Sequence, residues 1–240
     1  MSYTEHYYTQ FEFDRFYHIY NRGIDKKPIF LNEDNYHFFI RKYQKYIWPV
    51  AETVAYCLMG NHFHFIIKIR SVDELAALPQ KPERYVLVGA NGPEWKQDAT
   101  AAADAPAAAA APDLTTFEKL SNLRGSNPTA EPADCHSMVY PQFKKLFQSY
   151  AMAFNKQQNR CGTLFQTPFK RALIDSEDYL REVIRYVHKN PVQHNMVLQI
   201  EQWPWSSYNL IIQNKFKCLR QSTIEELFGN KMMFRNYHSG

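Results

Sequence analysis

Two histidines, His62 and His64, lie two residues apart in the segment 60–68. Successive side chains of an extended strand point to opposite faces, so both imidazoles share one face while Phe63 and Phe65 point to the other. Imidazole nitrogens bind divalent transition metals, and two ligands from one strand leave positions for water and substrate. The spacing therefore predicts half of a metal site. Polar surface, or a hydrogen-bonded pair of core histidines, would give the same pattern.

The other half of such a site is predicted on a helix over residues 175–190. Its buried stripe is formed by apolar residues at helical spacing: Leu180, Val183, Ile184 and Val187. Tyr186 and Asn190 are one turn apart, about 40° from each other, on the flank of that stripe. If the stripe packs on the histidine strand, a phenol and an amide oxygen join two imidazoles around one metal. Taken singly, Tyr186 also fits a boundary tyrosine, and Asn190 fits a helix C-cap before Pro191.

Charge is unevenly distributed along the chain. Residues 71–134 carry ten acidic and five basic side chains, a net charge of −5. The whole chain has a net charge of +4, so the other residues together carry +9. Residues 140–171 hold six basic and no acidic side chains, interleaved with aromatic rings. Cations suit phosphates and rings suit exposed bases, which favours a nucleic-acid surface. Its candidate DNA-binding residues are Lys144, Lys145, Lys170 and Arg171. Rings at spacings of three and four also fit the buried face of an amphipathic helix.

The elements that must position these residues follow from periodicity, caps and turns. Strands are expected over 11–21, 53–59, 62–69 and 164–174, and helices over 32–48, 141–158 and 175–190. This order is typical of an α+β domain with helices packed on a ferredoxin-like antiparallel sheet.

Domain organisation follows composition. An alanine-rich run over 99–112, broken by prolines, marks 71–138 as an acidic Ala/Pro-rich insertion that is partly disordered. It divides one domain into parts at 1–70 and 139–212, and 213–240 form a C-terminal extension.

Several protein classes are not favoured. No run approaches the ~18 apolar residues of a membrane span, and the first residues contain no apolar signal region. The four cysteines lie far apart without Cys-x-x-Cys spacing, which argues against a zinc knuckle or a disulfide framework. A reduced, cytoplasmic setting is expected.

Four segments together resemble the HUH single-tyrosine transposases, in particular the IS200-like and REP-associated tyrosine transposases. They are Tyr17-His18-Ile19-Tyr20-Asn21-Arg22-Gly23, Leu58-Met59-Gly60-Asn61-His62-Phe63-His64, Arg185-Tyr186-Val187-His188-Lys189-Asn190-Pro191-Val192 and Trp203-Pro204-Trp205-Ser206-Ser207-Tyr208. The resemblance covers roughly residues 11–70 and 138–212. The chain departs from the family at Pro168, where an arginine is frequent, and in the longer insertion after Ile69.

The resemblance implies an HUH endonuclease fold and a DNA transposase activity. Tyr186 would attack a phosphodiester of single-stranded DNA, forming a 5′-phosphotyrosine and freeing a 3′-hydroxyl. A divalent ion, Mg or Mn, held by His62, His64 and Asn190, would polarise the phosphate. An unperturbed tyrosine is a poor nucleophile at pH 7, so the site must stabilise the developing phenolate charge.

The resemblance also implies a DNA hairpin as partner. Arg22, Lys26 and Lys27, just after the first strand, are candidates for holding its stem, and His18 on that strand could face the metal. A homodimer is left open, because Tyr186 can work with the histidines of its own chain or of a partner. Two alternatives stay open: a metal-dependent nuclease that uses water, and a non-catalytic DNA-binding descendant of a transposase.

Overall fold

The computed structural model describes residues 7–78, 134–215 and 219–239. The strands are β1 (Phe16–Arg22), β2 (Ala51–Leu58), β3 (His62–Ile69) and β4 (Lys170–Ile174). The α-helices are α1 (Glu33–Tyr46), α2 (Val72–Ala77), α4 (Cys135–Gln157), α5 (Glu177–Gln193), α6 (Tyr208–Ile212), α7 (Gln221–Phe228) and α8 (Lys231–Ser239). Short 3-10 turns span Ile24–Lys26 (η2) and Ile200–Gln202 (η4). No helix in these ranges combines the length and apolarity that a membrane crossing needs.

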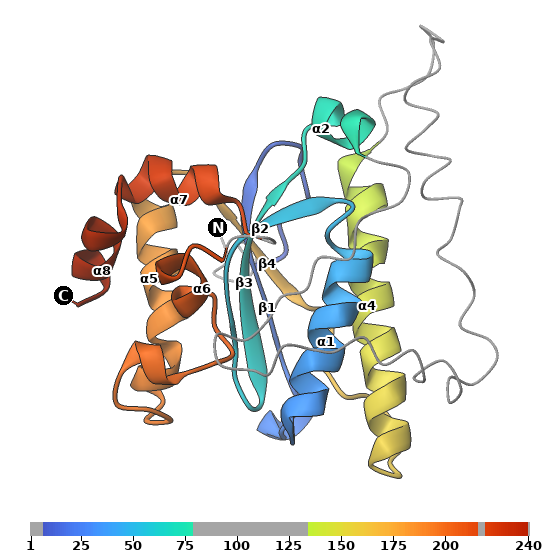
Figure 1. The fold of residues 1–240 in the computed structure, drawn as a ribbon. Coiled ribbons are helices and arrows are strands. Elements are labelled where there is room, and N and C mark those ends of the chain that lie inside the picture. Colours follow the sequence, from blue (N-terminus) through green and yellow to red (C-terminus); the bar gives the residue numbers. More distant parts are fainter. Residues whose placement is uncertain (1–6, 79–133, 216–218, 240) are drawn as a thin grey trace, which may run out of the picture.

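The four strands form one sheet in the order β2-β3-β1-β4, and every neighbouring pair is antiparallel (Figure 1). Central β1 and β3 are not consecutive in sequence, because α1 and β2 lie between them. Together with the element order, this is the split βαβ arrangement of ferredoxin-like folds. The predicted α+β class with an antiparallel sheet is confirmed.

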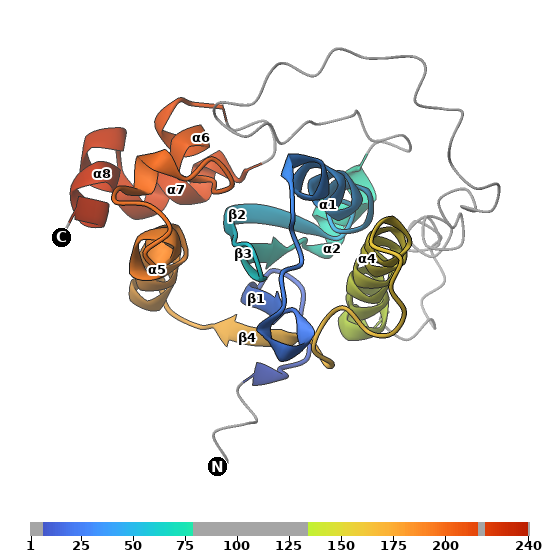
Figure 2. The same ribbon diagram turned by 90° about the horizontal axis from the view of Figure 1, so that it is seen from below.

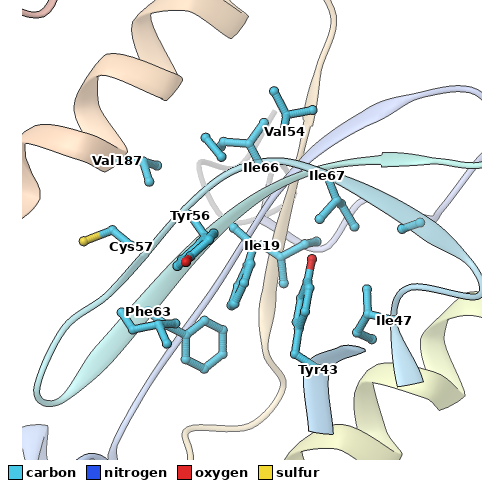
Figure 3. Close-up of a cluster of buried hydrophobic side chains, with 14 of the residues drawn as sticks. Ile19, Tyr43, Ile47, Val54, Tyr56, Cys57, Phe63, Ile66, Ile67 and Val187 are labelled. Carbon is cyan, nitrogen blue, oxygen red and sulfur yellow. The ribbon is translucent and has the colours of Figure 1, made fainter. Parts of the chain in front are cut away.

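The two faces of the sheet are covered differently. Figure 2 shows α1 and α4 side by side on one face and α5 on the other. Rings of α1 stack on the β3 rings of the first face: Phe39 lies 5.0 Å from Phe63 and Tyr43 lies 4.1 Å from Phe65, between centroids. On the second face, Val187 of α5 points toward the sheet near Cys57 (Figure 3). Strand alternation thus separates an aromatic core from the face that carries the histidines.

Several element boundaries differ from those expected. Helix α4 starts at Cys135, since Asp134 caps it by accepting from the His136 and Ser137 amides, and Pro141 lies within the helix. The expectation of a start at Pro141 followed the preference of proline for a first turn. Strand β4 begins only at Lys170, not at residue 164.

Helix α5 also departs from the expectation at both ends. Ser176, not Asp175, is its N-cap, since the Ser176 hydroxyl accepts from the Tyr179 amide. The helix continues through Pro191 to Gln193 instead of ending before the proline. This extra turn matters because it carries His194 toward the histidine strand.

The segment predicted as an insertion contains structure at both of its ends. Helix α2 begins at Ser71 with a capping box, in which Ser71 and Glu74 bind each other's backbone amides. At the other end, residues 135–138 belong to α4. The part between, 79–133, including the alanine-rich run, lies outside the described residues.

Candidate active site

Cross-strand pairing builds one wall of the site. In the antiparallel register of β1 and β3, Arg22 lies opposite His62 and Tyr20 lies opposite His64. Opposite residues share a face, so these four side chains gather on the face covered by α5. Both histidines are buried, with 7% and 5% of their surface exposed.

Helix α5 supplies the second wall. Its buried stripe of Leu180, Val183, Ile184 and Val187 packs toward the sheet, as the periodicity predicts. The Tyr186 ring then lies 5.5 Å from the His64 ring, and Asn190 Oδ1 lies 3.4 Å from His62 Nε2. Asn190 is fully buried, whereas Tyr186 is 42% exposed. The structure therefore brings the four predicted residues together within one chain.

Hydrogen bonds orient His62. Asn61 Nδ2 donates to the Lys26 carbonyl, which turns Asn61 Oδ1 toward His62 Nδ1 at 2.6 Å. The proton of His62 is thereby assigned to Nδ1, and Nε2 keeps its lone pair. Asn190 Nδ2 donates to the Tyr186 carbonyl, so Asn190 Oδ1 faces that lone pair. Two acceptor atoms thus converge at 3.4 Å without a proton between them, an arrangement that a cation would stabilise.

His64 is oriented by a third histidine. Its Nδ1 lies 2.9 Å from Nε2 of His18, on the neighbouring strand. If His64 Nδ1–H donates, its Nε2 keeps a lone pair for a metal, and His18 acts as the supporting acceptor. In that arrangement His18 fixes the tautomer of His64 instead of binding the metal itself.

Burial keeps these imidazoles neutral at pH 7. It lowers the pKa of His62 to about 4 and the pKa of His18 to about 3. The pKa of His64 lies well below its ordinary value, first through burial and then through His18, His62, His194 and Arg22. Neutral imidazole is the form that binds a metal. Among the described residues, no group of three or more His, Cys, Asp or Glu side chains could hold a metal ion, so any ion here would depend on the Asn190 amide.

Arg22 belongs to this site. It lies opposite His62, and its charge lowers the pKa of His62 and His64. Its Nε is buried and has no hydrogen-bond partner within the described part of the chain. A buried donor without an acceptor is costly. The following Gly23 is required by space, because a Cβ there would meet the Lys27 carbonyl oxygen at 2.2 Å.

Lys26 and Lys27 lie in the exposed turn that follows β1. Lys27 forms an exposed ion pair with Asp25 at 3.3 Å, and the Lys26 carbonyl accepts the Asn61 amide. This turn is therefore fastened to the residue that orients His62. The predicted contact of Lys26 and Lys27 with a hairpin stem stays a prediction.

The other predicted DNA-binding residues do not form one surface. Lys144 and Lys145 lie on α4, across the sheet from the histidines. Arg171 is buried and donates to the Thr9 and Tyr8 carbonyls at 2.7 and 3.0 Å. It therefore fastens the N-terminal segment, and the predicted role on a DNA surface does not match this placement. Only Lys170, which lies opposite Tyr20 on β4, shares the face of the site.

Two residues at the site were not predicted. The His194 ring lies 5.3 Å from the His62 ring, and its Nδ1 contacts the Asn190 carbonyl at 3.0 Å. Its position four residues after Asn190 was the available signal, but the expected helix end at Pro191 hid it. The Tyr20 ring stacks on His64 at 5.7 Å, about as near as Tyr186. Only the β1/β3 register reveals that contact.

Comparison with known proteins gives one curated relative. No protein-family model matches the chain. The chain is 22% identical over 158 residues to a Haemophilus influenzae protein named "Putative REP-associated tyrosine transposase", an alignment that covers 66% of this chain and 59% of the relative. Among solved structures, a REP-associated tyrosine transposase bound to a REP hairpin aligns with 90% of this chain and 87% of its own, at 15% identity and a TM-score of 0.47. The relative confirms the resemblance that the motifs predict, and the chain spans about three fifths of its length.

Proposed function

We propose that this chain is a tyrosine DNA endonuclease and strand transferase of the transposase type, acting on single-stranded DNA beside a hairpin. One observation carries the proposal: an exposed tyrosine on a helix lies next to two buried, neutral imidazoles on a strand. The similarity to a relative named as a putative REP-associated tyrosine transposase supports it. Because the residues converge within one chain, the proposed chemistry needs no partner subunit.

The proposed step is a phosphoryl transfer to Tyr186. The phenol oxygen forms a bond to phosphorus and loses its proton, and the bond from phosphorus to the 3′ oxygen breaks. The released 3′ oxygen takes up a proton and becomes a hydroxyl, while the 5′ side stays on the protein as a phosphotyrosine. The phosphodiester energy is conserved in the new bond, so the reverse attack by a 3′-hydroxyl can rejoin strands without ATP.

His62, His64 and Asn190 would hold a divalent cation, Mg or Mn, and the two nitrogen donors favour Mn over Mg. When bound, such an ion acts as a Lewis acid on the scissile phosphate. The positive charge of Arg22, beside the two histidines, would stabilise the negative charge that develops on the same phosphate. His18 and Asn61 orient the two histidines from behind.

Substrate contacts follow from the placement of charge. We assign the hairpin stem to the side of the exposed turn carrying Lys26 and Lys27, because backbone phosphates attract cations without sequence preference. Lys170 lies on the edge strand β4, opposite Tyr20 of β1. A strand that passes between that turn and Lys170 would cross the histidine pair beneath Tyr186.

The decisive experiment maps the covalent adduct. The protein is incubated with a labelled single strand containing a hairpin and with Mn²⁺, then digested, and the modified peptide is identified by mass spectrometry. The adduct is expected on Tyr186, and Tyr186→Phe should bind DNA normally but form none, because only the attacking oxygen is removed.

Tyr20→Phe and Tyr179→Phe are the matched controls. Tyr20 is the tyrosine whose ring also contacts His64, and Tyr179 lies seven residues before Tyr186 on nearly the same helix face. Both variants should retain the adduct. An adduct that persists in Tyr186→Phe would refute the assignment, and cleavage without any adduct would favour a nuclease that uses water.

A further inference from the structure

A group of tyrosines extends the site toward the edge of the sheet. We use the name tyrosine platform for Tyr7, Tyr20 and Tyr179 with Lys170. They come from four separate elements, namely the N-terminal segment, β1, α5 and β4. Tyr7 contacts Tyr20, and Tyr179 lies two turns before Tyr186 on nearly the same face of α5. Burial, followed by Tyr7, Tyr186 and Tyr179, raises the pKa of Tyr20.

The platform presents rings to solvent. Tyr7 and Tyr179 are 36% and 45% exposed, while Tyr20 is half-buried between them and the histidines. Tyr7 meets Tyr20 edge-on at 6.2 Å. Lys170 Nζ lies 5.2 Å from the Tyr7 ring centroid and 5.5 Å from that of Tyr20. A cation placed among exposed rings is the composition of a surface that binds single-stranded nucleic acid.

Backbone hydrogen bonds hold the segments that carry the exposed rings. The Arg171 guanidinium donates to the carbonyls of Tyr8 and Thr9, and Tyr8 forms a bridge with Arg171 along the outer edge of β4. Burying a guanidinium has a large desolvation cost, which its hydrogen bonds to the two backbone carbonyls help to offset. The same bonds hold the N-terminal segment against β4. Tyr179 is held by the first turn of α5. Holding the backbone in this way reduces the entropy that would be lost when a base stacks on these rings.

The platform is continuous with the proposed nucleophile. Tyr20 stacks on His18 at 4.7 Å and on His64 at 5.7 Å, and the Tyr186 ring contacts the same two histidines at 6.3 and 5.5 Å. Rings therefore run without interruption from Tyr186 across β1 to the edge of β4. A DNA strand whose phosphate lies at Tyr186 has its next nucleotides over these rings.

We propose that the tyrosine platform binds unpaired bases of the strand that flanks the scissile phosphate, by stacking, with Lys170 on an intervening phosphate. The inference rests on the proposed function and adds to it the part of the substrate that is recognised beside the cleavage point. Duplex DNA would bind poorly there, because its base faces are not available for stacking. The platform would then select single-stranded substrate.

Binding of labelled DNA without metal tests this inference in the Tyr186→Phe background, where no cleavage occurs. Tyr7→Ala and Tyr179→Ala should each weaken binding of a hairpin with a single-stranded flank about tenfold, whereas Tyr7→Phe and Tyr179→Phe should bind within about twofold of the parent. The matched control is Tyr46→Ala. Tyr46 lies on α1, on the other face of the sheet, and also has a lysine, Lys45, 5.5 Å from its ring. The Tyr46→Ala variant should bind the DNA as tightly as the parent.

Abasic flanks separate stacking from structural effects. A flank that keeps its phosphates but lacks bases should bind the parent about as weakly as the Tyr7→Ala/Tyr179→Ala double variant binds the normal flank, and the alanine variants should lose no further affinity on the abasic flank. Equal weakening on normal and abasic flanks would overturn the inference. Failure of the parent to bind any hairpin with a flank would instead refute the proposed function. Circular dichroism melts confirm that each variant is folded.

Discussion

Two groups of histidines lie on two sides of helix α5. The groups differ in how many of their imidazole nitrogens have hydrogen-bond partners. Toward the sheet lie the site histidines, His18, His62, His64 and His194. Toward the C-terminal helices lies the interhelix pair, His188 of α5 and His238 of α8. His18, His62 and His64 are buried like both members of the interhelix pair, and burial lowers the pKa of all five, so neither burial nor charge distinguishes these three from the pair.

The interhelix pair is fully satisfied. His238 Nδ1–H donates to the Phe234 carbonyl at 2.8 Å, so its Nε2 accepts from His188 Nδ1–H at 2.9 Å. His188 Nε2 then accepts from the Ser207 hydroxyl at 2.7 Å, and that hydroxyl accepts from the Tyr56 amide at 2.8 Å. The chain of bonds joins α8, α5 and β2 with every imidazole nitrogen used. Such a group stabilises tertiary structure and has no capacity left for a ligand.

The site histidines are incompletely satisfied. His62 Nε2 faces another acceptor, Asn190 Oδ1, and the neighbouring Arg22 Nε is a buried donor without a partner in the described residues. An exposed tyrosine lies over them. Unused hydrogen-bonding capacity beside an open position, and not the presence of histidine, therefore indicates the site.

The largest effect is expected from replacing both His62 and His64 with alanine. Metal-dependent cleavage should be abolished, and Mn²⁺ binding measured by calorimetry should fall by at least about a hundredfold, because two nitrogen ligands are lost. Stability should fall by less than about 2 kcal/mol, since neither imidazole completes a closed network. Undiminished cleavage by this double variant would remove the metal hypothesis.

Replacing His188 with alanine should have the opposite profile. We expect a loss of about 2–4 kcal/mol in the free energy of unfolding, because a cavity forms and Ser207 and His238 lose buried partners. Urea denaturation measures it, and Mn²⁺ affinity at low temperature should stay within about threefold of the parent. A loss of Mn²⁺ affinity with unchanged stability would show that the two groups are not independent.

Acid should weaken the interhelix pair over a defined pH range. Burial lowers the pKa of His238 to about 4, with Lys189 and Arg185 also lowering it and the Phe234 carbonyl and Glu201 opposing the shift. Between about pH 6.5 and 4, His238 binds a proton in the unfolded chain but not in the folded protein. Its full contribution to stability is therefore present above this range and is lost as pH falls through it. Urea denaturation measures the free energy of unfolding across that range. On acidification, His238→Gln should lose up to about 3 kcal/mol less of this free energy than the parent loses. Equal slopes for parent and variant would contradict the assignment.

The smallest effect is expected from replacing residues 79–133 with a short Gly/Ser linker. Both histidine groups lie outside that range, and loop length changes closure entropy only slowly, so stability should change by about 1 kcal/mol or less and cleavage should persist. Thermal melts and the adduct assay measure the two properties. If this variant loses cleavage or thermal stability, residues 79–133 contain an element that supports the domain.

Local periodicity was enough to predict much of this molecule. Strand alternation places His62 and His64 on one face, and helical register places Tyr186 and Asn190 together on the flank of a buried stripe. These relations involve neighbours in sequence, whose geometry the backbone repeat determines. The element order predicts the ferredoxin-like class for the same reason.

Tertiary structure alone decided which faces meet and which polar atoms remain unpaired. His18 reaches His64 across 46 positions, through a strand register that composition does not reveal. The basic stretch over 140–171 is one run in sequence, yet it divides between the two faces of the sheet and a buried guanidinium, because a helix and a strand within it point their side chains differently. The sequence does not distinguish His188 from His62, and both are buried in the structure. Only the completed hydrogen bonds of the first, and the unmatched acceptors beside the second, separate a structural residue from a candidate ligand.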